Sequence, residues 1–154
     1  MKEKRHLSIN SEDYRESFTV DQMYAQPEKL LALKVSKSVR DRNLAGNEEL
    51  NSKQIQECAE EAWRTQQCNF AAVEYVLATL PLDSRTRAII GVYQFGGLRD
   101  NETGKRLKRV SFQDMRPAPR EIAEKYLGKK ITGFHPRDTN PIRYFGKASR
   151  KKIQ

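Results

Sequence analysis

The chain contains 154 residues, of which 37% are hydrophobic and 32% are charged, and its net charge is +9. This length suits a single domain. The absence of an apolar run of about 18 residues excludes a membrane-spanning helix, and the opening stretch MKEKRHLSIN lacks the apolar centre of a secretory signal. Cys58 and Cys68 are too few for a disulfide framework and are not spaced as metal ligands. We therefore expect a cytoplasmic protein with no membrane partner, no bound metal and no cofactor.

The positive charge is concentrated in the second half of the chain. From residue 83 onward there are 18 basic and 7 acidic residues, a net charge of +11, whereas the first 82 residues carry a net charge of −2. Such asymmetry is typical of proteins that bind a polyanion, and nucleic acid is the usual one. A solubilising surface with a basic tail is the alternative reading.

Composition divides the chain into three segments. Residues 1–25 mix charges and hydroxyl groups with scattered apolar positions, which predicts a polar N-terminal arm that packs loosely or orders on a partner. A single α+β domain is expected over residues 26–146. Residues 147–154 are expected to form a basic C-terminal tail.

The first half of the domain is expected to hold one helix between two segments of ambiguous type. Alternating apolar residues over 27–39 favour a strand, although a helix also fits the spacing. An apolar stripe that includes Cys58 and Ala59 predicts a helix over 47–64. Residues 70–80 fit a strand, with an alanine-rich helix as the competing interpretation.

The second half of the domain is expected to be mainly β. The run RAIIGVYQF at residues 87–95 is rich in β-branched and aromatic residues, which predicts a strand buried on both faces. Gly96 and Gly97 allow a bend, and a hairpin follows with its return strand over 107–112. A helix is predicted over 119–128, and two short strands complete the domain. The expected fold is α+β, with a curved mixed sheet or small open barrel of five to six strands and two helices.

The chain resembles a widespread group of small prokaryotic and phage-type proteins in the order of the runs LLALKVSKS, AWR, EYVLA, IIGVY, RVSF, YLGKKI and NPIRYF. More distantly, the order of strand, helix and barrel-forming strands is similar to the PUA-like group, which includes the EVE, ASCH and YTH domains. This resemblance implies nucleic-acid binding, in some members through an aromatic pocket around a modified base, and a phage or mobile-element setting. Carried to this chain, it implies a pocket lined by Trp63, Tyr75, Tyr93 and Phe112, with Trp63 or Tyr93 stacking on a base.

Basic side chains are expected to form the rest of a surface that binds DNA or RNA. Lys105, Arg106, Lys108 and Arg109 lie along the rising edge of the hairpin and project to both of its faces. Such an edge suits a phosphate backbone, while protection against edge-to-edge aggregation is the alternative. Further contacts are expected from Arg116, Arg120, Lys129, Lys130, Arg137 and Arg143.

Two other functions remain open from the sequence. The basic face can dock an acidic protein partner, as an inhibitor or an assembly subunit would. His135 and Asp138 on one loop can serve a small nuclease or hydrolase, with the histidine as a base near neutral pH. The chain has no phosphate-binding glycine loop, no dinucleotide-binding fingerprint and no zinc-ligand spacing.

Overall fold

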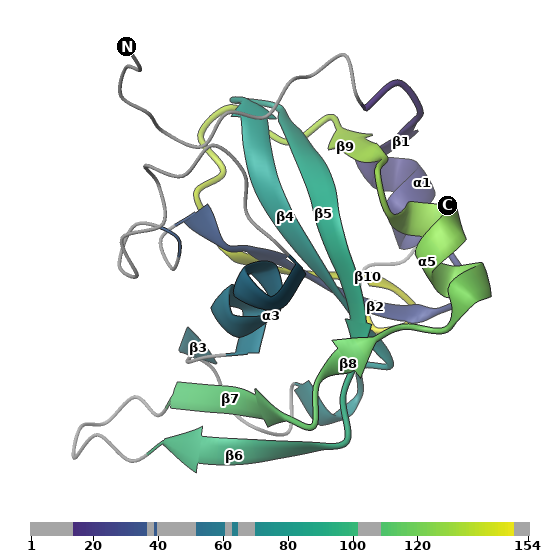
Figure 1. Ribbon diagram of the computed structural model, residues 1–154. Helices are drawn as coiled ribbons and strands as arrows, with labels where there is room; N and C mark the ends of the chain where they lie inside the picture. Colours follow the sequence, from purple (N-terminus) through teal and green to yellow (C-terminus); the bar gives the residue numbers. More distant parts are fainter. Residues whose placement is uncertain are drawn as a thin grey trace, which may run out of the picture.

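A curled mixed β-sheet forms the centre of the protein, and in this computed structural model it makes a half-barrel (Figure 1). The structure describes residues 14–36, 39, 52–60, 63–64, 70–101 and 109–149. In sheet order the strands are β1 (Ser17–Thr19), β9 (Lys130–Thr132), β5 (Thr86–Gln94), β4 (Tyr75–Asp83), β2 (Lys29–Lys34) and β10 (Ile142–Gly146), and β8 (Arg116–Pro117) adds to β5. The α+β class with a curved mixed sheet is thus confirmed.

The central strands are buried on both faces. In β2, Leu31 and Leu33 belong to one apolar cluster, while Leu30 and Ala32 belong to a second cluster on the opposite face. A strand with both faces covered reads as a continuous apolar run instead of an alternating one. The prediction of a doubly buried strand at 87–95 is confirmed by β5, and β2 and β4 are strands where a helix had also fitted the pattern.

The first face of the sheet is covered by helix α3 (Ser52–Glu60), which belongs to the crossover between β2 and its parallel neighbour β4. Parallel strands require such a long connection, and a helix usually supplies it. Cys58 and Ala59 are fully buried, so the expected apolar stripe faces the core. The predicted helix does not extend to residue 64, because Trp63 and Arg64 form β3 (Trp63–Arg64) in a second sheet.

The second face is covered by α1 (Val20–Tyr24) and α5 (Arg120–Tyr126). Thr19 caps α1, since its hydroxyl accepts a hydrogen bond of 3.0 Å from the Gln22 amide. Met23 of this helix is fully buried, and β1 pairs in parallel with β9. The expected arm of residues 1–25 therefore contributes a strand and a helix to the fold, and the described residues include three helices where two were expected.

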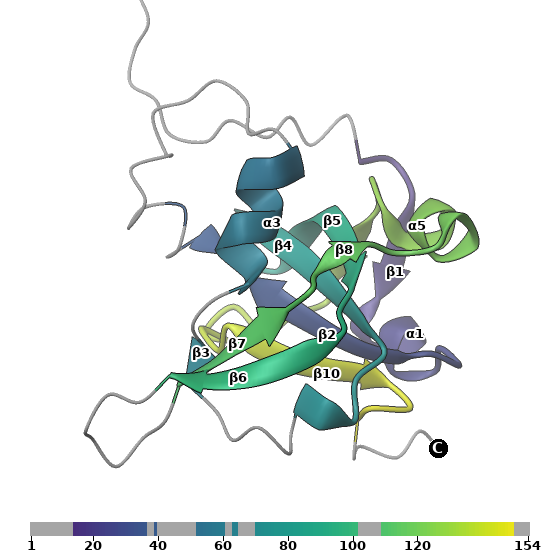
Figure 2. The same ribbon diagram turned by 60° about the horizontal axis from the view of Figure 1, so that its bottom comes forward.

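The second sheet is a bent continuation of the first (Figure 2). It contains β3, β7 (Arg109–Gln113) and β6 (Gly97–Asn101) in that order. The chain passes from β5 through Gly96 into β6 and returns from β7 through Asp114 into β8. A Cβ added at Gly96 would lie 3.0 Å from the Cβ of Asp114, and Asp114 has a φ of 57°. The expected bend at the glycines is confirmed.

Candidate nucleic-acid interface

Two of the basic residues predicted to share one surface lie near opposite ends of β5. Arg116 is opposite Gln94 at one end of this strand, and Lys130 is opposite Ala88 near the other end. Six residues of extended strand separate these positions, which corresponds to roughly 20 Å. The described members of the predicted set therefore do not form one compact patch.

Near the loop between β9 and β10, two arginines share one carboxylate. The Arg143 guanidinium binds Asp138 and also donates a hydrogen bond of 2.9 Å to the Tyr24 hydroxyl. Arg87 of β5 lies 3.8 Å from the same carboxylate, and its guanidinium carbon is 4.0 Å from the centre of the Phe134 ring. We call Arg87, Asp138 and Arg143 the loop cluster. It fastens the loop to the half-barrel.

The loop cluster is largely removed from water. The side chains of Arg87 and Asp138 are only 4% and 9% exposed, and that of Arg143 is 24% exposed. Burial lowers the pKa of Arg87, an effect that Asp138 opposes and Arg143 reinforces. Arg143 is therefore committed to holding the loop, although the sequence predicted that it would contact phosphate.

His135 and Asp138 are not arranged as an acid–base pair. His135 is exposed, and its Nδ1 accepts a hydrogen bond of 3.1 Å from the amide of Arg137. The Asp138 carboxylate is turned to the two arginines instead. Within this described loop, no hydrogen bond joins the two side chains that the hydrolase alternative requires.

Several of the other predicted basic residues contact groups on neighbouring elements. The Lys129 ammonium donates to the carbonyl oxygens of Glu124 and Lys125, at 2.8 and 2.9 Å, where α5 ends. Arg120 pairs with Glu124 at 2.9 Å on the exposed face of the same helix. The Arg116 side chain donates to the Asp114 carbonyl oxygen at 2.8 Å. The Lys129 contacts stabilise the end of α5, and the Arg116 contact stabilises the bend between the sheets.

Other basic residues of the described chain lie in the second sheet. In its ladder, Arg64 of β3 lies directly opposite Arg109 of β7, whose other neighbour is Asn101 of β6. Arg99 of β6 is exposed. We call β6 and β7 the basic ribbon, and both views show it extending away from α5 (Figure 1, Figure 2). Three further predicted contacts, Lys105, Arg106 and Lys108, lie outside the described residues.

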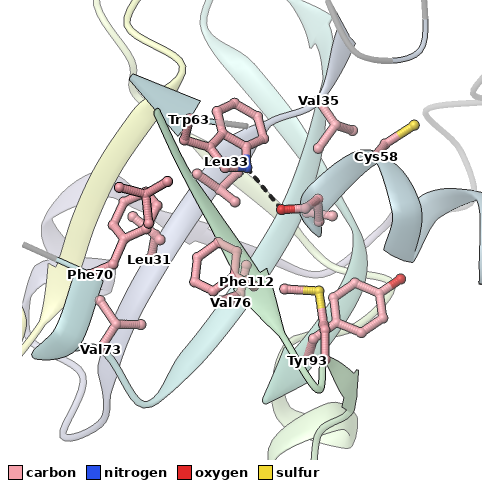
Figure 3. Packing of buried hydrophobic residues seen from close by; sticks show 14 of the residues in the cluster. Leu31, Leu33, Val35, Cys58, Trp63, Phe70, Val73, Val76, Tyr93 and Phe112 are labelled. Carbon is pink, nitrogen blue, oxygen red and sulfur yellow. Dashed lines mark hydrogen bonds between the residues drawn. The ribbon is translucent and has the colours of Figure 1, made fainter. Parts of the chain in front are cut away.

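The two aromatic residues predicted to stack on a base belong to the core. Trp63 is 8% exposed, and its indole nitrogen donates a hydrogen bond of 2.8 Å to the Ala59 carbonyl oxygen of α3 (Figure 3). Tyr93 is 5% exposed, and burial, with smaller contributions from Cys58 and Glu60, raises the pKa of its hydroxyl. Neither ring presents a face to solvent in this structure.

Sequence reasoning missed two buried polar clusters. The position of Arg87 in the sequence could have indicated a buried ion pair, since a charged residue at the start of a doubly buried strand requires an internal partner. No local pattern indicated the other cluster, because its residues are 98 positions apart in the chain. There the Tyr126 hydroxyl donates a hydrogen bond of 2.5 Å to the Glu28 carboxylate. Burial raises the pKa of Tyr126. Although burial opposes it, hydrogen bonds from Tyr126 and Lys125 lower the pKa of Glu28.

The described residues contain no cluster of three or more histidine, cysteine or acidic side chains suited to a metal ion. Cys58 is buried in the core, and Cys68 lies outside the described residues. None of the helices in the described ranges is long and apolar enough to cross a membrane. The chain matches no family model, no curated protein and no solved structure. The resemblance to the PUA-like group stays a prediction.

Proposed function

We propose that the protein binds nucleic acid through the basic ribbon and its neighbour β3. The supporting observation is the ladder register that pairs Arg64 with Arg109. Like charges at opposing positions of an antiparallel pair destabilise a sheet. A bound phosphate backbone would offset this repulsion, which gives the pair a use that the isolated protein does not provide.

The amount of charge in this region fits a phosphate-binding surface. Residues 97–113 contain five basic and two acidic residues, and β3 adds one more arginine. The six basic positions are Arg64, Arg99, Lys105, Arg106, Lys108 and Arg109. Six phosphate contacts correspond to a loss of roughly a thousandfold in affinity between about 50 and 200 mM salt.

The basic side chains near the loop between β9 and β10 should contribute less to binding. Arg143 and Arg87 are held by Asp138, and Lys129 is held by backbone carbonyl groups. Moving the two arginines onto phosphate would leave the buried Asp138 carboxylate without its partners, which costs free energy. We therefore propose that the basic ribbon makes most of the phosphate contacts. We also propose that the protein is cytoplasmic.

The test is a salt titration of nucleic-acid binding that is monitored by fluorescence anisotropy. It compares the full wild-type chain with a variant in which Lys105, Arg106 and Lys108 are replaced by alanine. The wild-type affinity should fall with a slope of about −5 in log–log form, and the variant slope should be shallower by about 3, because three phosphate contacts are lost. An affinity that does not depend on salt would contradict the proposal.

A matched control removes the same charge elsewhere. Replacing Arg116, Arg120 and Arg137 by alanine also lowers the net charge by three, and all three side chains are exposed. This variant should keep its affinity within about threefold of the wild type, since only long-range attraction is lost. Equal losses in both variants would mean that binding is spread over the whole surface. A failure to bind any nucleic acid would favour the alternative of an acidic protein partner.

A further inference from the structure

The loop cluster joins two strands that are not neighbours in the sheet. Strand β5, which carries Arg87, is separated from β10, which carries Arg143, by β4 and β2. Arg87 lies opposite Ile131 in the ladder, and Arg143 lies opposite Ala32. Both of these ladder partners belong to the apolar cluster on the second face of the sheet. The curl of the half-barrel therefore brings the two guanidinium groups to one carboxylate on that face.

The two guanidinium groups are held in place by groups other than this carboxylate. Their central carbon atoms lie 4.0 and 5.4 Å from the centre of the Phe134 ring, which is itself 3% exposed. The face of an aromatic ring attracts a guanidinium group at such distances. Arg143 also donates a hydrogen bond of 2.9 Å to the Tyr24 hydroxyl, and the Tyr24 ring packs on Phe145. Removing the Asp138 carboxylate should therefore leave two arginines already in position.

The Arg87 side chain lacks close acceptors within the described residues. Its polar contacts there are the Asp138 carbonyl oxygen at 3.4 Å, the Asn140 carbonyl oxygen at 3.5 Å and the Asp138 carboxylate at 3.8 Å. Good hydrogen bonds from a nitrogen donor span about 2.7 to 3.2 Å. Because the side chain is only 4% exposed, water cannot readily supply the missing acceptors. Arg87 therefore needs an anion near its guanidinium group.

The loop cluster also carries more positive than negative charge. Asp138 and Arg143 are the charged groups that shift the pKa of Arg87, so two cations and one anion share a site that is largely removed from water. An unbalanced buried charge is unfavourable, and loss of the carboxylate would make the imbalance larger. The cluster therefore favours an anion at the position that the Asp138 carboxylate occupies.

We infer that Arg87 and Arg143 form a carboxylate-binding site, which the chain fills with its own Asp138 side chain. The site accepts a free carboxylate of the same size when that side chain is removed. Because the Asp138 side chain is only 9% exposed, the site is enclosed and excludes larger acids. Its occupation holds the loop between β9 and β10 on the half-barrel, and it does not depend on the proposed function.

The experiment replaces Asp138 with alanine in the full chain and measures chemical denaturation in formate and in chloride at equal ionic strength. Formate matches the carboxylate group that this variant loses, because alanine keeps the Cβ carbon. The folding equilibrium constant of the variant should rise about tenfold in about 100 mM formate, as for a ligand that binds only the folded state with a Kd of about 10 mM. The wild type should change by less than about twofold, since its site is filled.

A matched control uses a second aspartate in a turn. Asp83 accepts a hydrogen bond of 2.8 Å from the Arg85 amide, and Asp138 accepts one of 3.0 Å from the Asn140 amide. Asp83 is exposed, so its removal leaves no enclosed site. Asp83→Ala should therefore respond to formate no more than the wild type does. Acetate, which is larger by one methyl group, should stabilise Asp138→Gly more than Asp138→Ala.

A double variant tests the inference even if Asp138→Ala does not fold in chloride. The yield of folded Asp138→Ala should then rise when formate is present during refolding. Replacing Arg87 with methionine as well removes the most buried cation, so the yield of the double variant should not depend on formate. Equal formate responses of Asp138→Ala and Asp83→Ala, an Asp138→Ala variant that stays unfolded in formate, or a formate response retained in the double variant would each overturn the inference.

Discussion

The two ends of the half-barrel accommodate arginine in opposite ways. Where β9 leads into β10, Arg87 and Arg143 share the Asp138 carboxylate and lie against the Phe134 ring. In the second sheet, Arg64 has another arginine, Arg109, at the opposing position of the ladder. The first arrangement satisfies positive charge within the fold, whereas the second concentrates it.

A count of basic residues in the sequence overestimates the positive charge that is accessible to a ligand. Arg143 and Arg116 were expected to act alike, yet Arg143 is largely enclosed in a charge cluster and Arg116 is exposed at a bend. A buried carboxylate within hydrogen-bond distance, such as that of Asp138, holds an arginine within the fold instead of leaving it to a ligand. The comparison can be tested by variants at each end.

The largest expected effect is on stability, at the loop cluster. Replacing Asp138 with asparagine should lower the free energy of unfolding by about 3 kcal/mol, because Arg87 would remain buried without its counter-charge. Chemical denaturation of the variant and the wild type measures the difference. The nucleic-acid affinity proposed above, measured at a temperature where the variant is folded, should stay the same. A stable variant with weakened nucleic-acid binding would reverse the roles assigned to the two ends.

The next effect comes from the tyrosine–carboxylate contact. Replacing Tyr126 with phenylalanine should cost about 2 kcal/mol at neutral pH, since its hydroxyl bonds to the ionised Glu28. The pKa of Tyr126 is raised above its ordinary value of 10.0, so its contribution to stability is complete below pH 10 and is lost as the pH rises further. Denaturation midpoints measured across this range should fall less steeply in the variant.

The same contact also acts at low pH. Because the pKa of Glu28 is lowered from its ordinary value of 4.5, its stabilising contribution is present above that pH and is lost as the pH falls. Removing the Tyr126 hydroxyl removes one of the hydrogen bonds that lower this pKa. The acid-induced loss of stability should therefore be smaller in the variant, and an unchanged acid profile would contradict the assignment.

A smaller effect of opposite sign is expected on the second sheet. Replacing Arg64 with threonine should raise the free energy of unfolding by about 0.5 kcal/mol, because one of two opposing positive charges is removed and threonine favours strands. If the proposed function holds, the same change should weaken nucleic-acid binding and make its salt slope shallower by about 1. A variant that loses both stability and affinity would show that Arg64 has a structural role instead.

The smallest effect is expected for the exposed ion pair on α5. Arg120 and Glu124 have side chains that are 88% and 66% exposed, and such pairs contribute little because water and salt screen them. Replacing Arg120 with alanine should leave both the denaturation midpoint and the proposed nucleic-acid affinity unchanged within experimental error. A clear loss of affinity would extend the binding surface from the ribbon toward α5.

Much of the secondary structure could be predicted from local patterns, and its ambiguities had one physical cause. Residues 87–95 read as a strand because β-branched and aromatic residues dominate them, and they form β5. Residues 70–80 fitted a helix as well, because a strand covered on both faces loses the alternation that identifies it. Only the packing of α3 on one face and α5 on the other accounts for that pattern in β4.

The candidate site was predictable in composition but not in arrangement. The hairpin and its bend at Gly96 were expected, as was the excess of positive charge. The burial of Trp63 and Tyr93 was not, since a lone tryptophan at a helix end fits a binding surface as well as a core. Their hydrogen-bond partners and neighbouring rings come from distant parts of the chain, which local spacing does not record.

The sequence by itself determined the α+β class, the central buried strand, the bent hairpin and the sign of the net charge, because these depend on local composition and on short-range conformational preferences. The tertiary structure alone decided which arginines are neutralised, which aromatic rings are covered and which basic residues face one another across a ladder. Those outcomes depend on contacts between residues far apart in the chain, since pairing of charges and burial of rings are properties of the folded packing.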